Sequence, residues 1–138
     1  MQPAPPREVE ARWRPPGQRE VRSYANSTDA TEVAAYCLAL AATELTLGLT
    51  AVARAEAATG GDWYLVSQDT SVPRDGHVDW EPGHAVLFEV SGLDADSDSK
   101  LTSLLVAKAD QVRRQGWRGE AFAGVVGFLG HRVWLKKA

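Results

Sequence analysis

The sequence predicts one α/β domain with a mixed central sheet, and two observations support this. The chain has 138 residues, which suits a single domain, and 44% of them are hydrophobic, which is enough to build a core. Helix-like and strand-like patterns of apolar residues also alternate along the chain. We expect residues 26–138 to form this domain, in the order helix, three strands, helix and one or two closing strands.

Residues 1–25 precede the domain and have a different composition. They hold five prolines and five arginines, and their charge is +2, against −5 for the rest of the chain. Proline fixes φ and lacks an N–H donor, so we expect an extended arm. The arm is either a disordered tail or, with Trp13 among its arginines, a segment that touches a phosphate backbone or a partner protein.

The first helix is expected from Asp29 to Leu47. Asp29 and Glu32 have the spacing of a capping box, and Gly48 is suited to end the helix. Residues 33–47 are apolar on almost every side, which predicts burial against more than one neighbour. Cys37 lies in this run and is expected to be a small buried hydrophobe.

The other elements follow from periodicity and turn residues. Leu101, Leu104, Leu105 and Val112 would form the buried face of a second helix. The polar loop 68–83 has room for part of a hairpin. The expected elements are strands at 49–56, 62–66 and 84–90, a helix at 100–114, and closing strands at 122–128 and 132–135.

Several classes of protein fit this sequence poorly. It has neither a run of about 18 apolar residues nor an apolar signal-peptide core, so we expect a cytoplasmic protein without a membrane span. Its one cysteine excludes an intramolecular disulfide, and no Cys/His cluster suggests zinc. The acidic balance of residues 26–138 argues against tight binding of nucleic acid.

Two carboxylates occupy unusual positions in the strand pattern. Asp62 follows two glycines at the start of the second strand, where it is either a turn residue or part of a site. Glu89 interrupts an otherwise apolar third strand, where carboxylates are rare without partners. Carboxylates on adjacent strand ends can share a hard divalent cation.

The element order and these acids resemble the PD-(D/E)XK restriction-endonuclease-like superfamily. In that family the second strand begins with aspartate and the third ends in Asp/Glu-x-Lys; here Asp62 and Glu89-Val90-Ser91 stand at those places. The resemblance spans roughly residues 29–135. It implies Mg²⁺ or Mn²⁺ held by Asp62, Glu89 and the backbone carbonyl of Val90, and hydrolysis of a phosphodiester.

One departure concerns the family's lysine, whose place is taken by Ser91. Some members of the family supply this lysine from the following helix, and Lys108 is the candidate here. Its spacing from Leu104 and Leu105 places it in the middle of the apolar stripe, where a lysine either serves a purpose or extends its ammonium to solvent. Glu32 would also approach such a site, but its place in the capping box already explains it.

Three functions are compatible with these residues. The first is a metal-dependent nuclease acting on DNA or RNA, with Asp62, Glu89 and Lys108 as its catalytic residues. The second is a catalytically inactive protein of the same fold that binds a protein or nucleic acid. The third is an unrelated α/β module whose arm does the binding. A homodimer is also compatible, because small nucleases of this kind commonly dimerise to cut both strands.

Overall fold

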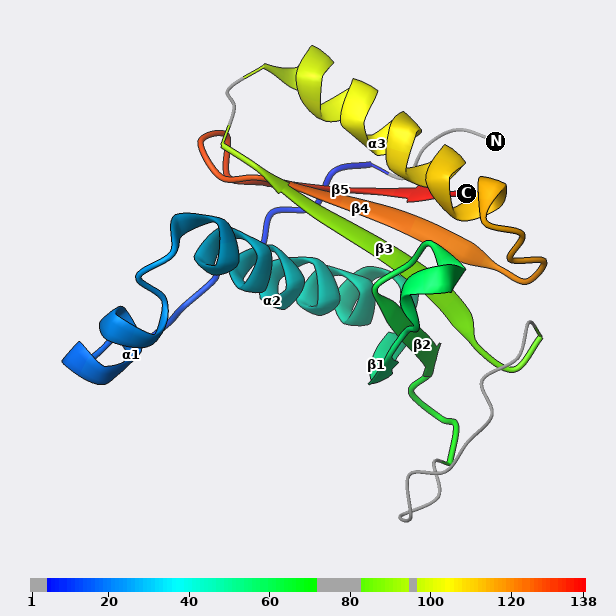
Figure 1. Cartoon of the computed structure of the whole chain (residues 1–138), viewed down its shortest axis with the longest axis horizontal. Helices are drawn as coiled ribbons and strands as arrows, with labels where there is room; N and C mark the ends of the chain where they lie inside the picture. Colours follow the sequence, from blue (N-terminus) through cyan, green and yellow to red (C-terminus); the bar gives the residue numbers. More distant parts are fainter. Residues whose placement is uncertain (1–4, 72–82, 95–96) are drawn as a thin grey trace.

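A computed structural model describes residues 5–71, 83–94 and 97–138 (Figure 1). It contains one five-stranded sheet with strand order β1-β2-β3-β4-β5. The elements are α1 (Gln18–Ser23), α2 (Ser27–Leu47), β1 (Leu49–Arg54), the 3-10 turn η1 (Ala57–Thr59), β2 (Trp63–Ser67), β3 (Val86–Leu93), α3 (Asp98–Arg114), β4 (Ala121–Gly127) and β5 (Arg132–Lys137). β3 and β4 are parallel and all other neighbours are antiparallel. The predicted α/β class, mixed sheet and element order are confirmed.

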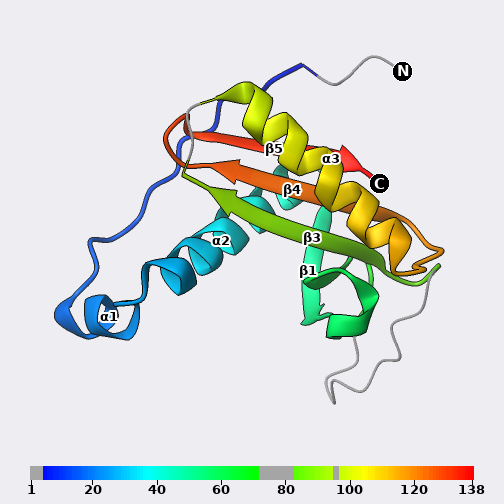
Figure 2. The ribbon, with the colours of Figure 1, turned by 45° about the horizontal axis from the view of Figure 1, so that its top comes forward.

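The two long helices cover opposite faces of the sheet, as Figures 1 and 2 show. Ala35 and Ala39 of α2 pack against Phe88 of β3. Leu101 and Leu105 of α3 lie on the other face, against β4. The parallel pairing of β3 with β4 requires a crossover connection, and α3 provides it. Side chains that alternate along β3 therefore point to different helices.

α2 begins and packs differently from the sequence expectation. Its N-cap is Asn26, whose Oδ1 accepts hydrogen bonds from Thr28 N at 2.9 Å and Asp29 N at 3.2 Å. The predicted capping box is therefore wrong. Both Asn26 and Asp29 are good N-cap residues, and the structure uses the earlier one, which lies three residues before the predicted cap. The helix ends at Gly48, with φ 65°, as predicted.

The expected burial of α2 on several sides is also wrong. Its buried residues are Ala35, Tyr36, Ala39 and Thr43, which form one face against the sheet. Cys37 is exposed and not buried as expected. An apolar run without periodicity does not say how many neighbours a helix has, and within the described residues the sheet covers only one side of α2.

α2 is also the one described helix that is long and apolar enough, by length and composition, to cross a membrane. This is weak evidence for a span, because the core helix of a globular domain passes the same test. α2 packs against β1, β3, β4 and β5, as a core helix of the domain does.

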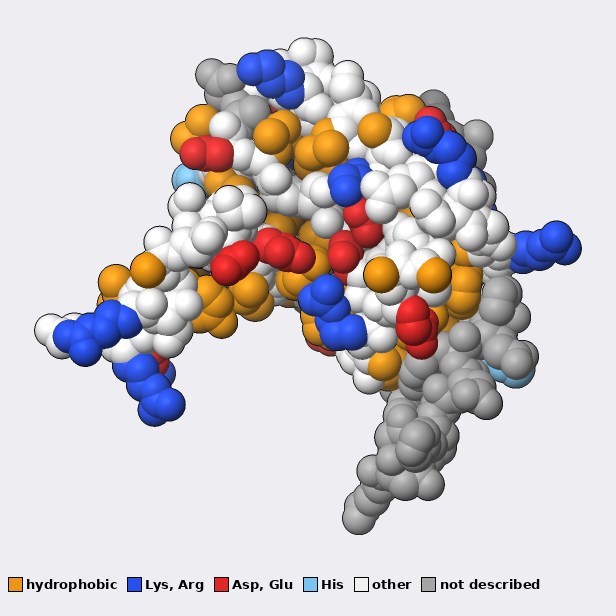
Figure 3. All heavy atoms as spheres, viewed as in Figure 1, with side chains coloured by type: hydrophobic (Ala, Val, Ile, Leu, Met, Phe, Trp, Pro, Cys, Tyr) orange, Lys and Arg blue, Asp and Glu red, His pale blue; other side chains and the backbone are white. Residues whose placement is uncertain are grey.

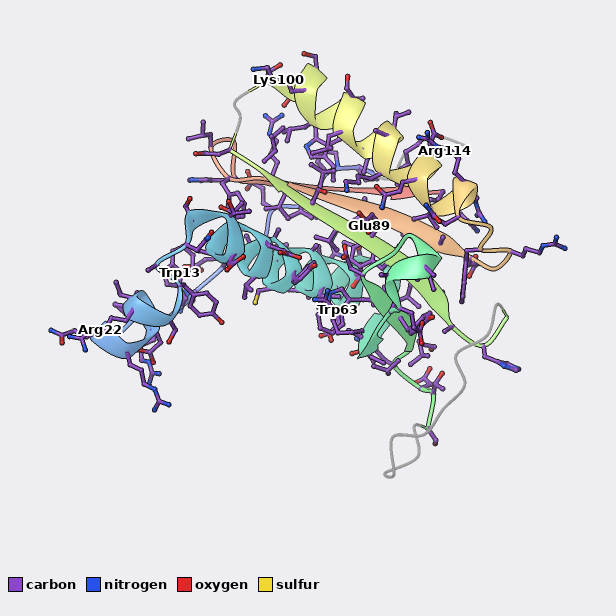
Figure 4. The ribbon with its side chains drawn as sticks, viewed as in Figure 1. Trp13, Arg22, Trp63, Glu89, Lys100 and Arg114 are labelled. Carbon is purple, nitrogen blue, oxygen red and sulfur yellow. The ribbon has the colours of Figure 1, made fainter. Side chains whose placement is uncertain are left out.

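The arm is not extended throughout, because residues 18–23 form the short helix α1. The last proline of the arm is Pro16, and the residues that follow it are free to adopt a helical turn. α1 has no buried residue. Arg7 Nη1 donates a hydrogen bond to the carbonyl oxygen of Leu45 at 3.1 Å. Figure 4 shows Trp13 and Arg22 away from the sheet.

β3 is longer at its C-terminal end than the sequence predicted. It continues to Leu93 because it pairs in register with β4 as far as Gly127. Glu89 therefore lies in the middle of the strand and not near its end. The hairpin considered for residues 68–83 falls largely on 72–82, which lie outside the described residues.

Candidate functional site

Asp62 lies where β2 and β3 separate. β2 pairs with β3 through residues 63–65 only, and Asp62 N donates to the Phe88 carbonyl at 2.8 Å just before this pairing begins. Asp62 Oδ2 accepts a hydrogen bond from Val90 N at 2.8 Å. In a strand the N–H and C=O of one residue point to the same side, so the Val90 carbonyl faces the same gap. Asp62 therefore binds the backbone of β3 instead of closing a turn.

Glu89 points to the α3 side of the sheet and is only 5% exposed. Its Oε1 accepts hydrogen bonds from Lys108 Nζ at 2.8 Å and from Gln111 Nε2 at 3.2 Å. Its carboxyl group is also close enough to that of Asp62 for the two to interact. The three predicted site residues Asp62, Glu89 and Lys108 therefore meet, although they come from three different parts of the chain.

Lys108 lies at the edge of the buried stripe of α3, and not in its middle as expected. The stripe consists of Leu101, Leu105, Ala109 and Val112. From this edge the ammonium reaches Glu89, and the Lys108 side chain keeps 25% of its surface exposed. Lys108 Nζ also donates to Gln111 Oε1 at 3.3 Å. The lysine is therefore paired inside the domain and does not extend away to solvent.

The surroundings of Glu89 shift the pKa of its carboxyl group in opposite directions. Burial raises the pKa of its carboxyl group, as does the charge of Asp62, while the hydrogen bond and charge of Lys108 lower it. Burial is the largest of these effects, and the pKa rises to about 7. The carboxyl group therefore changes charge close to neutral pH.

A tyrosine links α2 to this site. The Tyr36 hydroxyl lies 2.5 Å from Glu32 Oε1 and 3.1 Å from Asp62 Oδ1. The preference for Glu32 as a capping residue is wrong, because the helix starts earlier and Glu32 stands four residues before Tyr36 on one helical face. Burial, the hydrogen bond to Glu32 and the nearby Asp62 raise the pKa of Tyr36 above its usual range.

Three residues at the site were absent from the sequence prediction: Tyr36, Arg54 and Gln111. Helical spacing would have found two of them, because Gln111 follows Lys108 by three positions and Tyr36 follows Glu32 by four. Gln111 Nε2 also donates to the Gly60 carbonyl at 3.2 Å, which ties α3 to the loop before β2. For Arg54 the sequence carries no such signal.

The donors available to a metal are oxygen atoms. Among the described residues no group of three or more His, Cys, Asp and Glu side chains is placed to hold a metal ion. Asp62 and Glu89 are two carboxylates, and the Val90 carbonyl faces the same gap. Mg²⁺ fits such a set, because it takes one or two protein carboxylates and keeps several waters.

The site opens onto one face of the molecule. Figure 3 shows acidic side chains in the hollow between α2, α3 and the β1–β2 hairpin, with a basic side chain on either side. In Figure 4, Glu89 lies on β3 between α3 and this hairpin. Ser91 carries no charge, and Lys108 supplies a cation next to Glu89. No protein-family model, no curated protein and no solved structure matches this chain.

Proposed function

We propose that the chain is a divergent PD-(D/E)XK restriction-endonuclease-like protein that hydrolyses phosphodiester bonds of DNA or RNA with Mg²⁺ or Mn²⁺. The observation that carries this proposal is the 2.8 Å contact between the Lys108 ammonium and Glu89, beside Asp62. The order α2, β1, β2, β3, α3, β4, with β3 parallel to β4, supports the fold part of the proposal.

Asp62, Glu89 and the Val90 carbonyl would hold the cation. When bound, it would polarise a phosphodiester and lower the pKa of a coordinated water. The Asp62 carboxylate is already oriented by Val90 N and the Tyr36 hydroxyl, which leaves it few ways to turn. Such fixed oxygen atoms favour binding because little ordering remains to be done.

Lys108 would supply the positive charge that Ser91 cannot provide. Its ammonium is held against Glu89 and close to Gln111. From there it would offset negative charge that develops on a phosphate oxygen bound at the carboxylates. Gln111 keeps the lysine, the glutamate and the loop before β2 in one arrangement.

The test is nicking of supercoiled plasmid, and cleavage of single-stranded DNA and RNA, with Mg²⁺ or Mn²⁺. Lys108→Met and Glu89→Gln keep side-chain volume and should each lose at least about 100-fold in rate. Lys100→Met, on the first turn of the same helix, removes the same charge away from the site and should keep the wild-type rate. Equal rates in all four proteins would contradict the proposed site.

The alternative is a catalytically inactive protein of the same fold that acts as an interaction subunit. It is favoured by Ser91, which cannot replace the lysine, and by Glu89, whose Oε1 already accepts hydrogen bonds from both Lys108 and Gln111. A structural ion pair would look the same. Wild-type protein that is folded but cleaves none of the DNA or RNA substrates with either metal would favour this alternative.

A further inference from the structure

Arg54 is brought to the rim of the site by an irregularity in the sheet. The pairing between β1 and β2 shifts after Ala51, which leaves Val52 as the extra residue of a bulge. Arg54 is therefore opposite Trp63, where an unshifted register would have placed Asp62. Residues directly opposite each other share a sheet face, and bulges commonly redirect side chains next to functional sites. Arg54 consequently lies on the same side as Trp63, facing α2.

The guanidinium of Arg54 is held by two aromatic rings. Its Cζ lies 4.7 Å from the centre of the Tyr36 ring and 5.0 Å from that of Trp63. The two rings meet edge to face, with their centres 5.7 Å apart and an angle of 83° between them. Arg54 Nη2 also donates to the Tyr36 hydroxyl at 3.3 Å. Figure 4 shows Trp63 where α2 meets the β1–β2 hairpin.

This arrangement leaves most of the donors of Arg54 unused. A guanidinium has five N–H groups, and in Arg54 one nitrogen bonds a neutral hydroxyl. In the part of the chain that the structure describes, no carboxylate oxygen lies within 4.0 Å of Arg54. The side chain is exposed. The arginine is thus ordered by stacking, while its charge remains available to an external anion.

The place of Arg54 relative to the carboxylates indicates which anion would bind. The same Tyr36 hydroxyl that accepts from Arg54 is 3.1 Å from Asp62 Oδ1. A strand that offers a phosphodiester to Asp62 and Glu89 would bring a phosphate to this rim. The planar fork of a guanidinium matches a phosphate group with two parallel hydrogen bonds, and an already ordered fork loses less freedom on binding.

We propose that Arg54 binds a backbone phosphate of a nucleic-acid strand next to the Asp62–Glu89 pair. This inference rests on the proposed function, because it takes a phosphodiester as the substrate. A phosphate contact of this kind positions the strand without reading its sequence. It also gives a local basis for binding in a domain whose overall charge is negative.

The test is fluorescence anisotropy with a labelled single-stranded DNA and an RNA of the same sequence. Binding is measured in EDTA, where cleavage cannot contribute, over a series of salt concentrations. Arg54→Gln should weaken binding about tenfold at low salt and reduce the salt slope by about 0.7, the value for one phosphate contact on a single strand. Arg54→Lys should keep most of the slope and weaken binding less, because it retains the charge but not the fork.

Arg132→Gln is the matched control. Arg132 is an exposed arginine of β5, paired with Asp98 at 2.8 Å, and its loss changes the net charge equally. It should leave the dissociation constant within about twofold of the wild-type value. The inference is overturned if Arg54→Gln and Arg132→Gln have equal effects, or if the wild type binds neither strand at low salt. It is also overturned if Arg54→Gln lowers the melting temperature but leaves binding unchanged, which is the signature of a purely structural arginine.

Failure of this inference can be distinguished from failure of the proposed function. If the wild type cleaves and Arg54→Gln cleaves with the same kcat and KM, the nuclease stands and the phosphate contact is wrong. If the wild type cleaves nothing but Arg54→Gln still weakens binding selectively, the phosphate contact stands and the catalytic assignment fails.

Discussion

Replacing Lys108 with methionine should destabilise the protein in a manner that depends strongly on pH. Methionine keeps the length of the stem and removes the ammonium that lies 2.8 Å from Glu89. Glu89, 5% exposed and close to Asp62, then loses its charged partner. Removing one partner of a buried ion pair typically costs about 3 to 5 kcal/mol, because the remaining charge is uncompensated. Glu89 avoids this cost only by binding a proton.

The direction of this pH dependence follows from the pKa of Glu89, which is 4.5 in an ordinary setting and about 7 in the folded chain. A carboxyl group whose folded pKa is raised favours folding most below the unfolded pKa. This contribution is lost as pH rises from 4.5 through 7. Without Lys108, which lowers the pKa of Glu89, the folded pKa rises further and the loss extends to higher pH. We expect Lys108→Met to cost about 1 kcal/mol near pH 5, for a lost hydrogen bond, and about 3 kcal/mol near pH 9.

Urea unfolding of both proteins at about pH 5, 7 and 9 measures these differences in the free energy of unfolding. Lys100→Met is the control and should show no pH-dependent change. Glu89→Gln combined with Lys108→Met removes the titrating group, so most of the loss at high pH should disappear. A destabilisation that is the same at all three pH values would refute the reasoning, since it would come from packing and not from an unpaired charge.

Three further predictions concern other parts of the molecule. Calorimetry should detect weak binding of Mn²⁺ by the wild type and none by Glu89→Ala, and equal binding by both would exclude Glu89 as a ligand. In Gly61→Ala the new Cβ would lie 2.5 Å from Cγ of the buried Leu87, so the free energy of unfolding should fall by about 1 to 3 kcal/mol; an unchanged urea midpoint would show that the loop adjusts freely. Deletion of residues 1–20 should move the melting temperature by only about 2 °C, because no residue of α1 is buried, and a large drop in a thermal scan would mean that the arm packs.

Much of the fold could be predicted from local patterns. The stripe of α3, the stop at Gly48 and the strand residues around Glu89 depend on neighbours within one element, which the sequence records directly. The predictions were wrong where two nearby residues could both cap a helix, and where the length of a strand depends on the strand that pairs with it. Asn26 and Asp29 are both suitable caps, and only the folded chain selects one. The end of β3 at Leu93 depends on how far β4 runs beside it.

The exposed side of α2 could not be predicted for a related reason. Its apolar run lacks the periodicity that would identify a single buried face, so the sequence did not reveal that Cys37 would be exposed. Burial depends on which surfaces other elements present, and the sheet presents only one to this helix in the described chain.

By itself, the sequence identified Glu89 as a carboxylate in a buried strand and Lys108 as a cation close to an apolar stripe. Only the tertiary structure decided that these two side chains meet, that Asp62 bonds the backbone of Val90, and that Arg54 stacks between Tyr36 and Trp63. Periodicity specifies the direction of a side chain relative to its own helix or strand. Contacts between residues distant in sequence also require the strand register, the bulge at Val52 and the position of each helix over the sheet, which are set by packing of the whole domain.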